Sequence, residues 1–355
     1  MKFTYTVGNP PYQQESEKKS DINGQTRRKN IFQVFQMQVD KVTKKTSVLI
    51  YPGARWIHQS GKGVEQFGKD QINDVMLSKL RYYPYANEVF ANSGITDGIS
   101  IVVKNHEKNE EGFEYSYVVD GVIDEIKVEN PGEDLLPLNP KDHVILKKVD
   151  HFVKKYDLQY MHDRILPQKL FGIESDFVSK NPDKVKLYDY KMEGTISDDY
   201  VKILANDKAG AAGRSKWFVG SSNLIKQSKE FIKQWQVVVS SAHPGGQSGR
   251  DNQIEIIDDH SVFGRSRVAL GSFMTKKEAE NFYKYNCSKI IKYTFLMTDE
   301  ALTSLGKKVP DLIDYSSNGI IDFSRSIDDQ LEFLVGITEE EKNHIQKTLD
   351  NTRGA

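Results

Sequence analysis

The chain has 355 residues, and 49 Lys and Arg against 50 Asp and Glu give it a formal net charge of -1. This balance excludes overall basicity as a sign of nucleic-acid binding, so any such surface must come from local clustering of charge. The single cysteine, Cys287, excludes an internal disulfide and a cysteine-rich metal site, and we expect a cytoplasmic protein. No apolar run is long enough to span a bilayer, and this length predicts two domains.

The first 105 residues alternate between strand and helix patterns. Strands are expected at 3–7, 46–51, 80–83 and 98–103, and helices at 31–42 and 64–77. Asn30 is expected to cap the first helix, and the polar residues 13–29 before it are expected to form a loop. This alternation predicts an open α/β sheet with helices on its faces.

The stretch Gly8-Asn9-Pro10-Pro11-Tyr12 follows the first strand directly. The two prolines fix consecutive φ angles, and Pro10 keeps Asn9 out of the helical region. The loop therefore presents the Asn9 amide oxygen and the Pro10 carbonyl in one orientation, with the Tyr12 ring beside them. Two acceptors and a ring form a clamp for a flat group that carries an amine. Ligands of open α/β sheets bind at the carboxyl ends of strands, where residues 51–55 are also expected.

The character of the sequence changes near residue 107, where charged and then Pro-, Gly- and acid-rich segments begin. We expect one domain at 1–108 and a second, α+β domain at 109–355. Thr275 with Glu278, and Thr338 with Glu341, have the spacing of capping boxes and predict helix starts.

The Asn-Pro-Pro-Tyr stretch after an apolar strand resembles the catalytic motif of amino-group DNA methyltransferases, in particular the adenine-specific enzymes of restriction–modification systems. Residues 48–55 are similar to the strand and loop that follow the motif in that family, and residues 88–92 with 98–101 are similar to the segment that closes its catalytic sheet. Residues 270–285 resemble the end of a target-recognition domain in its combined restriction–methylation branch. The resemblance implies a partial Rossmann-like methyltransferase sheet followed by an α+β target-recognition domain.

The resemblance also implies roles for the clamp residues. Enzymes of this family flip the target adenine out of the duplex. Asn9 and the Pro10 carbonyl would accept hydrogen bonds from its exocyclic amine, Pro11 would stiffen the loop, and Tyr12 would stack on the base. The methyl donor would be S-adenosylmethionine.

One departure from the family concerns the cofactor. The first strand, glycine-rich turn and acidic residue that bind it normally precede the catalytic motif, but eight residues precede Asn9 here, and no similar segment follows. We therefore expect the second half of a methyltransferase, with its own cofactor-binding residues unknown and a separate chain supplying the cofactor half or a nuclease. The alternatives are a non-catalytic DNA-binding subunit or degenerate remnant, and a methyltransferase acting on protein glutamine or RNA.

Basic and aromatic residues spaced among glycines are candidates for binding double-stranded DNA. For each one, a solvated surface position balanced by nearby acids is the alternative. Eight histidines without metal-ligand spacing predict no metal site. The candidate DNA contacts are Lys208, Arg214, Lys216, Trp217, Lys226, Gln247, Arg250, Asn252, Arg265 and Arg267.

Overall fold

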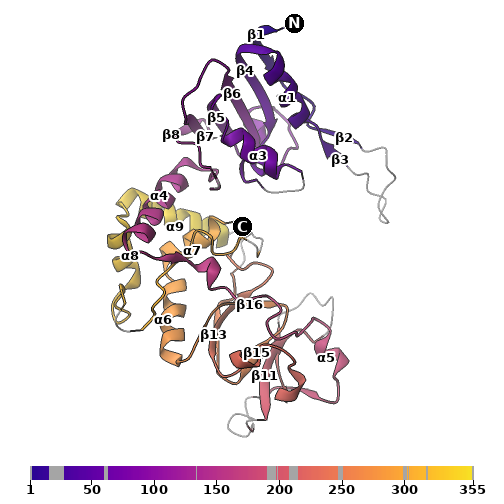
Figure 1. The fold of residues 1–355 in the computed structure, drawn as a ribbon, viewed down its shortest axis with the longest axis vertical. Helices are drawn as coiled ribbons and strands as arrows, with labels where there is room; N and C mark the ends of the chain where they lie inside the picture. Colours follow the sequence, from indigo (N-terminus) through magenta and orange to yellow (C-terminus); the bar gives the residue numbers. More distant parts are fainter. Residues whose placement is uncertain are drawn as a thin grey trace. The chain divides into compact units, whose positions relative to one another are not determined.

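The computed structural model divides the chain into two compact units, Met1–Val144 and Ile145–Ala355 (Figure 1). It describes residues 2–15, 28–59, 63–132, 134–189, 197, 199–207, 215–246, 251–298, 302, 304–316 and 319–353. Within these residues, no helix is both long and apolar enough to cross a membrane. Each unit is described by itself.

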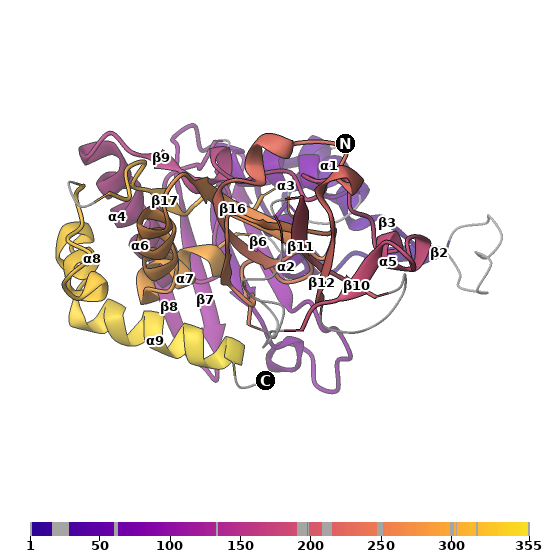
Figure 2. The ribbon, with the colours of Figure 1, turned by 90° about the horizontal axis from the view of Figure 1, so that it is seen from below.

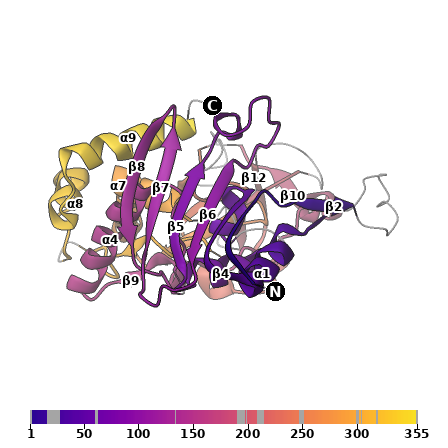
Figure 3. The ribbon, with the colours of Figure 1, turned by 90° about the horizontal axis from the view of Figure 1, so that it is seen from above.

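A six-stranded mixed sheet forms the first unit, which confirms the expected mixed α/β architecture (Figure 3). The first two neighbours are parallel, as are the fourth and fifth, and the remaining pairs are antiparallel. In spatial order the strands are β1 (Phe3–Gly8), β4 (Thr43–Pro52), β6 (Ile99–Asn105), β5 (Leu77–Tyr83), β7 (Phe113–Val119) and β8 (Val122–Val128).

Three helices contribute to the core on one face of this sheet: α1 (Phe32–Val42), α2 (Ala54–Ile57) and α3 (Glu65–Ile72). Phe32 packs against Tyr51 of β4, with ring centroids 5.3 Å apart, and Trp56 packs edge-on against the same ring at 5.6 Å. The Trp56 indole donates to Ser100 Oγ of β6 at 2.9 Å. The alternating burial of β4 from Ser47 onward follows from this one covered face.

The first unit extends beyond the expected boundary at 108/109. The parallel register of β5 with β7 places Leu80 beside Tyr115, and both side chains are fully buried. The Tyr115 hydroxyl donates to the Leu138 carbonyl at 2.6 Å, which ties the segment after β8 to the same core. The division therefore falls after Val144 instead.

The polar stretch after the clamp, expected to be a loop, has short paired strands at its two ends. Strand β2 (Gln13–Glu15) pairs antiparallel with β3 (Arg28–Asn30). The expected Asn30 cap is wrong, because Asn30 lies in β3 and its side chain accepts from Gln13 Nε2 at 3.2 Å. Helix α1 begins one residue later than that cap would require, with Ile31 at its N-cap.

Two larger sheets, a two-stranded sheet and a group of helices build the described part of the second unit. Strand β13 (Trp235–Ser240) lies between two hydrophobic cores. Its residues Val237 and Val239 belong to the core that the helices form, and Val238 belongs to the core of the four-stranded sheet. Figure 2 shows helices α6 to α9 together, with β10 to β12 away from them beyond β16. The sheets have the orders β10 (Val185–Leu187), β12 (Lys216–Ser221), β11 (Tyr200–Ala205), β15 (Ser261–Phe263), and β14 (Glu255–Ile257), β13 (Trp235–Ser240), β16 (Arg267–Phe273).

Both predicted capping boxes are confirmed. Thr275 caps α6 by accepting from the Glu278 N–H at 3.2 Å, and Thr338 accepts from the Glu341 N–H at 3.3 Å. The unit's longer helices are α4 (Pro140–Lys155), which begins in the first unit, α6 (Lys276–Asn286), α7 (Lys289–Leu296), α8 (Ile327–Val335) and α9 (Glu339–Arg353). Short elements complete it: α5 (Phe177–Lys180) and the paired strands β9 (Gln159–Tyr160) and β17 (Pro310–Asp311).

Candidate functional site

Several loops follow strands that end on the same side of the six-stranded sheet, and this side is called the carboxyl edge below. Gly8 at the end of β1 lies beside Leu49, and Pro52 at the end of β4 lies beside Ile99. Tyr83 at the end of β5 pairs with the same Ile99. The carboxyl ends of β1, β4 and β5 therefore lie on one side of the sheet, where ligands of α/β sheets bind.

The clamp loop leaves this edge from β1. Asn9 and Pro11 are exposed, Pro10 is buried and Tyr12 is half-buried. The Tyr12 carbonyl accepts from the Ile31 N–H at 3.1 Å, which anchors the loop to the start of α1. Burial raises the pKa of the Tyr12 hydroxyl, so the ring stays neutral. The result is an exposed amide on a stiff backbone, next to an anchored aromatic ring.

The second loop, after β4, is bound tightly to the start of β6. The Gly53 N–H donates to the Gly98 carbonyl at 2.9 Å, and the Ala54 N–H donates to the Asp97 carbonyl at 2.8 Å. A Cβ added to Gly53 would lie 2.1 Å from the Asp97 carbonyl oxygen. A Cβ added to Gly98, whose φ is +71, would lie 2.4 Å from the Tyr83 carbonyl oxygen. These glycines allow the backbones of two loops to touch.

Arg55 and Asp97 place opposite charges at the same edge. The Arg55 N–H donates to Asp97 Oδ2 at 3.4 Å, and its Nε lies 4.0 Å from Oδ1. Burial raises the pKa of Asp97, and Arg55 opposes that rise. The Arg55 side chain is 75% exposed and leaves its guanidinium open to solvent. The sequence analysis did not single out Asp97, because its only sequence signal is an Asp-Gly pair just before a strand.

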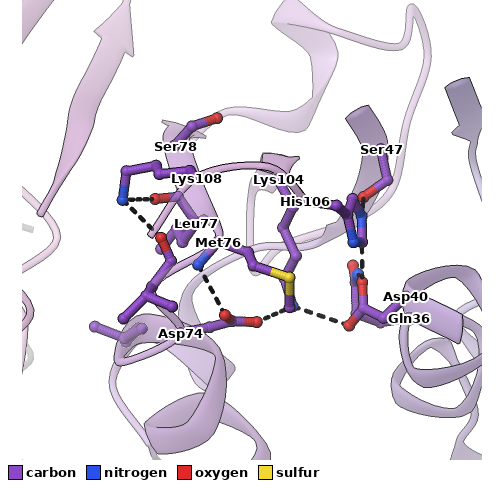
Figure 4. A network of polar contacts seen from close by, with 12 residues as sticks. Gln36, Asp40, Ser47, Asp74, Met76, Leu77, Ser78, Lys104, His106 and Lys108 are labelled. Atoms are coloured by element: carbon purple, nitrogen blue, oxygen red, sulfur yellow. Dashed lines mark hydrogen bonds and ion pairs between the residues drawn. The ribbon is translucent and has the colours of Figure 1, made fainter. Parts of the chain in front are cut away.

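A polar network lies at the other ends of these strands, away from the carboxyl edge (Figure 4). Lys104 of β6 bonds both to Asp40 of α1 and to Asp74, which precedes β5. The Ser47 hydroxyl lies 3.1 Å from His106 Nε2. These contacts hold α1, whose start carries the anchor of the clamp loop, against the sheet. Their role is structural.

Four candidate DNA contacts lie where β13 ends and β12 and β16 begin. Ser215 Oγ lies 2.6 Å from Ser266 Oγ, and the Ser240 N–H donates to the Asn252 carbonyl at 2.7 Å. These contacts connect the segments that carry Lys216, Asn252, Arg265 and Arg267.

The candidates differ in their surroundings. Lys216 is 56% exposed and lies 2.7 Å from Asp207, and Arg265 is 52% exposed and lies 3.4 Å from Glu174. Asn252 and Arg267 are buried, and Arg267 lies 3.2 Å from the Glu255 carboxylate. Of the others, Trp217 packs on the core of the four-stranded sheet and Lys226 donates to the Asn223 carbonyl, whereas Lys208, Arg214, Gln247 and Arg250 lie outside the described residues.

A family comparison covers the part of the chain that holds the clamp. Residues 1–90 match the family model of the Eco57I restriction-modification methylase. This match includes the clamp loop, the α1 anchor and the Gly53 loop, and it supports the resemblance to restriction–modification methylases. No curated protein matches the chain.

Among the described residues, no group of three or more His, Cys, Asp or Glu is placed to hold a metal ion.

Solved structures of restriction–modification enzymes are distantly similar. The type IIG restriction endonuclease BpuSI has 10% identity and a TM-score of 0.36, over 99% of this chain and 53% of that chain. The type IIL enzyme MmeI in complex with DNA has 8% identity and a TM-score of 0.34, over 99% and 57%. A modification subunit assigned to a type I restriction enzyme from Vibrio vulnificus YJ016 has 14% identity and a TM-score of 0.24, over 34% and 27%. The chain thus spans well under two thirds of each, and the function proposed below does not rest on these similarities.

Proposed function

We propose that this chain carries the base-accepting part of an adenine-specific DNA methyltransferase of a restriction–modification system, with S-adenosylmethionine as methyl donor. The observation that carries the proposal is the exposed Asn9 amide on a diproline loop at the carboxyl end of β1. It lies within the residues that match the methylase family.

The chain's own residues would act by positioning the base. Asn9 Oδ1 and the Pro10 carbonyl oxygen would each accept one N–H bond from the exocyclic amine of a flipped adenine. Both bonds draw the nitrogen lone pair out of conjugation with the ring, and Tyr12 would stack on the base for about 1–3 kcal/mol. Alignment and charge stabilisation suffice for this transfer, so Asn9 is proposed as an acceptor and not as a general base.

The described residues at this edge do not fit a cradle for the methyl donor. A dinucleotide-type cradle uses glycines to bring backbone close to the ligand. Gly53 and Gly98 instead bring the backbones of two loops against each other, with no room for a Cβ at either. We therefore propose that a partner polypeptide carries the cofactor site, and that the second unit contributes contacts to double-stranded DNA.

The test measures labelled methyl transfer from S-adenosylmethionine to adenine in duplex DNA. The full chain is combined with the purified polypeptide encoded beside its gene. Asn9→Ala should lower transfer by about 10²–10³-fold, as losing one charge-stabilising partner does elsewhere, while DNA affinity stays within about twofold. The exposed Gln14 is the matched control, and Gln14→Ala should leave transfer unchanged.

Three outcomes would contradict the proposal. Equal loss of DNA binding in Asn9→Ala would place the clamp outside the acceptor site. DNA binding without transfer by the combined polypeptides would indicate a non-catalytic DNA-binding subunit or a degenerate remnant. Transfer to protein glutamine or to RNA in preference to DNA would change the substrate class.

A further inference from the structure

Arg55 lies on the short helix α2, which follows β4 directly at the carboxyl edge. Its chain neighbours fix its backbone from both sides. Trp56 and Ile57 are 1% and 0% exposed, and the Ala54 N–H donates to the Asp97 carbonyl at 2.8 Å. The Arg55 side chain is nevertheless 75% exposed. The backbone of this arginine is therefore held in place, whereas its charged end lies in solvent.

The Asp97 carboxylate lies beside Arg55 but forms no hydrogen bond with its guanidinium. Asp97 Oδ2 accepts from the Arg55 backbone N–H at 3.4 Å, whereas Arg55 Nε lies 4.0 Å from Oδ1, which is beyond hydrogen-bond distance. A guanidinium carries five N–H donors in a planar fork that matches the oxygens of a phosphate. The fork of Arg55 is thus open to an anion from outside the chain.

Arg55 is the one Lys or Arg in the described loops of the carboxyl edge. These loops are residues 9–12, 52–59, 84–98 and 120–121, the last of which follow β7, a strand parallel to β5. The acids in the same loops are Glu88, Asp97 and Asp120. An edge with this balance repels a polyanion in general, so its single cation determines where a phosphate can approach.

We propose that the Arg55 guanidinium binds a backbone phosphate of the nucleotide whose base the clamp holds. Gly8 of β1 lies in register with Leu49 of β4 in neighbouring parallel strands, which are about 5 Å apart. The Asn9 loop and the Arg55 loop therefore leave the same side of the sheet from adjacent strands. The inference rests on the proposed function, because that function supplies the flipped adenine.

This contact gives the flipped nucleotide a second fixed point. Phosphate contacts set the register and orientation of a nucleic acid without reading its sequence. The clamp would hold the base, and Arg55 would hold the backbone beside it. Because the buried Trp56 fixes α2 before DNA arrives, less conformational freedom is lost when the guanidinium binds.

The test measures DNA binding without methyl donor, so that it is independent of catalysis. The probe is a fluorescently labelled DNA duplex with one mismatched adenine, because a mismatched base leaves the stack most readily. Its affinity for the full chain is measured at several salt concentrations. Arg55→Ala should weaken binding about tenfold at low salt and reduce the salt slope by about 1. Arg55→Lys keeps the charge and should retain the slope.

Lys44→Ala is the matched control for the loss of a positive charge. Lys44 is exposed at the other end of β4, so its substitution should change the affinity less than twofold. Asp97→Asn should strengthen DNA binding about twofold, because it removes the acid that competes with a phosphate for Arg55. If the two residues only held their loops together, Arg55→Ala and Asp97→Asn would both weaken DNA binding.

Four results would overturn the inference: no binding of the duplex, an unchanged salt slope for Arg55→Ala, an equal effect of Lys44→Ala, or weaker binding by Asp97→Asn. Methyl transfer by the combined polypeptides separates this inference from the proposed function. A reduced salt slope for Arg55→Ala without any methyl transfer by the unmodified chain would refute the methyltransferase function and leave the phosphate contact in place. Transfer by Arg55→Ala with an unchanged KM for DNA would overturn the contact and leave the proposed function in place.

Discussion

The Lys104 ammonium group lies 2.6 Å from the Asp74 carboxylate, although the lysine side chain is only 1% exposed. Asp40 lies 3.0 Å from the same nitrogen, so one buried cation is shared by two acids. The three residues come from β6, the turn before β5 and helix α1. A buried charge is costly unless it is paired and hydrogen-bonded. Separating α1, the turn before β5 or β6 from the others would leave Lys104 or an acid unpaired, so these ion pairs stabilise their packing.

Replacing Lys104 by methionine should strongly destabilise the first unit. The change leaves two carboxylates close together without their cation, and breaking a buried pair costs about 3–5 kcal/mol. Hydrogen exchange of the β4 and β6 amides, combined with urea titration, measures the loss. Lys79→Met is the control, because Lys79 and its partner Glu114 are 56% and 45% exposed and exposed pairs contribute about 0–1 kcal/mol. Equal effects of the two substitutions would contradict the structural role of the network.

His106, in the same network, should make stability depend on pH. Burial lowers the pKa of His106, with Asp40 opposing and Lys104 reinforcing that shift. Below the ordinary value of about 6.5 the unfolded chain binds a proton that the folded chain resists. Stability is therefore fully present above pH 6.5 and declines as the pH falls below it. Urea titrations at pH 7.5 and 5.5 should show a smaller decline for His106→Gln than for the unmodified chain, and identical declines would contradict this assignment.

Local sequence signals predicted the parts of the fold that depend on neighbouring residues. The strand before Asn9, the diproline loop and the Thr275 capping box each involve residues within a few positions of one another, so their spacing carries the information. The family match over residues 1–90 supports the interpretation of that loop.

Features that depend on distant pairing were missed. The boundary between the units follows Val144 and not residue 108, because β7 pairs with β5 and this pairing buries Tyr115 in the first unit. The sequence around Tyr115 predicts a strand but does not show which unit the strand joins. Arg267 resembled any exposed arginine until its pairing with Glu255 across the sheet was known. In each case the deciding partner lies in another strand, and register cannot be read from one strand by itself.

The contact between the loop after β4 and the segment before β6 predicts opposite outcomes for Gly53 and Gly94. A methyl group at Gly53 would lie 2.1 Å from the Asp97 carbonyl oxygen, whereas one at Gly94 meets nothing within 4 Å. Gly53→Ala should therefore cost about 1–3 kcal/mol, as overpacking does, and displace the loop that carries Arg55. Gly94→Ala should stay within about 0.5 kcal/mol, as for an ordinary surface change. Thermal unfolding measures both, and equal stabilities would show that the two loops do not touch in solution.

In the second unit, exposed and buried basic residues should respond differently to substitution. Lys216 is 56% exposed, so if it contacts a phosphate, Lys216→Ala should weaken DNA binding for all sequences and reduce the salt slope by about 1. Arg267 is 7% exposed and paired with Glu255, so Arg267→Ala should lower the free energy of unfolding by about 1–3 kcal/mol.

The measurements are DNA affinity as a function of salt concentration and urea titration of each variant. Arg267→Ala should keep the salt slope of the unmodified chain wherever it remains folded, because its charge is already neutralised by Glu255. A reduced slope for Arg267→Ala with unchanged stability would instead place its guanidinium on the DNA. An unchanged slope for Lys216→Ala would leave Asp207 as the only partner of that lysine among the described residues, and would remove it from the DNA surface.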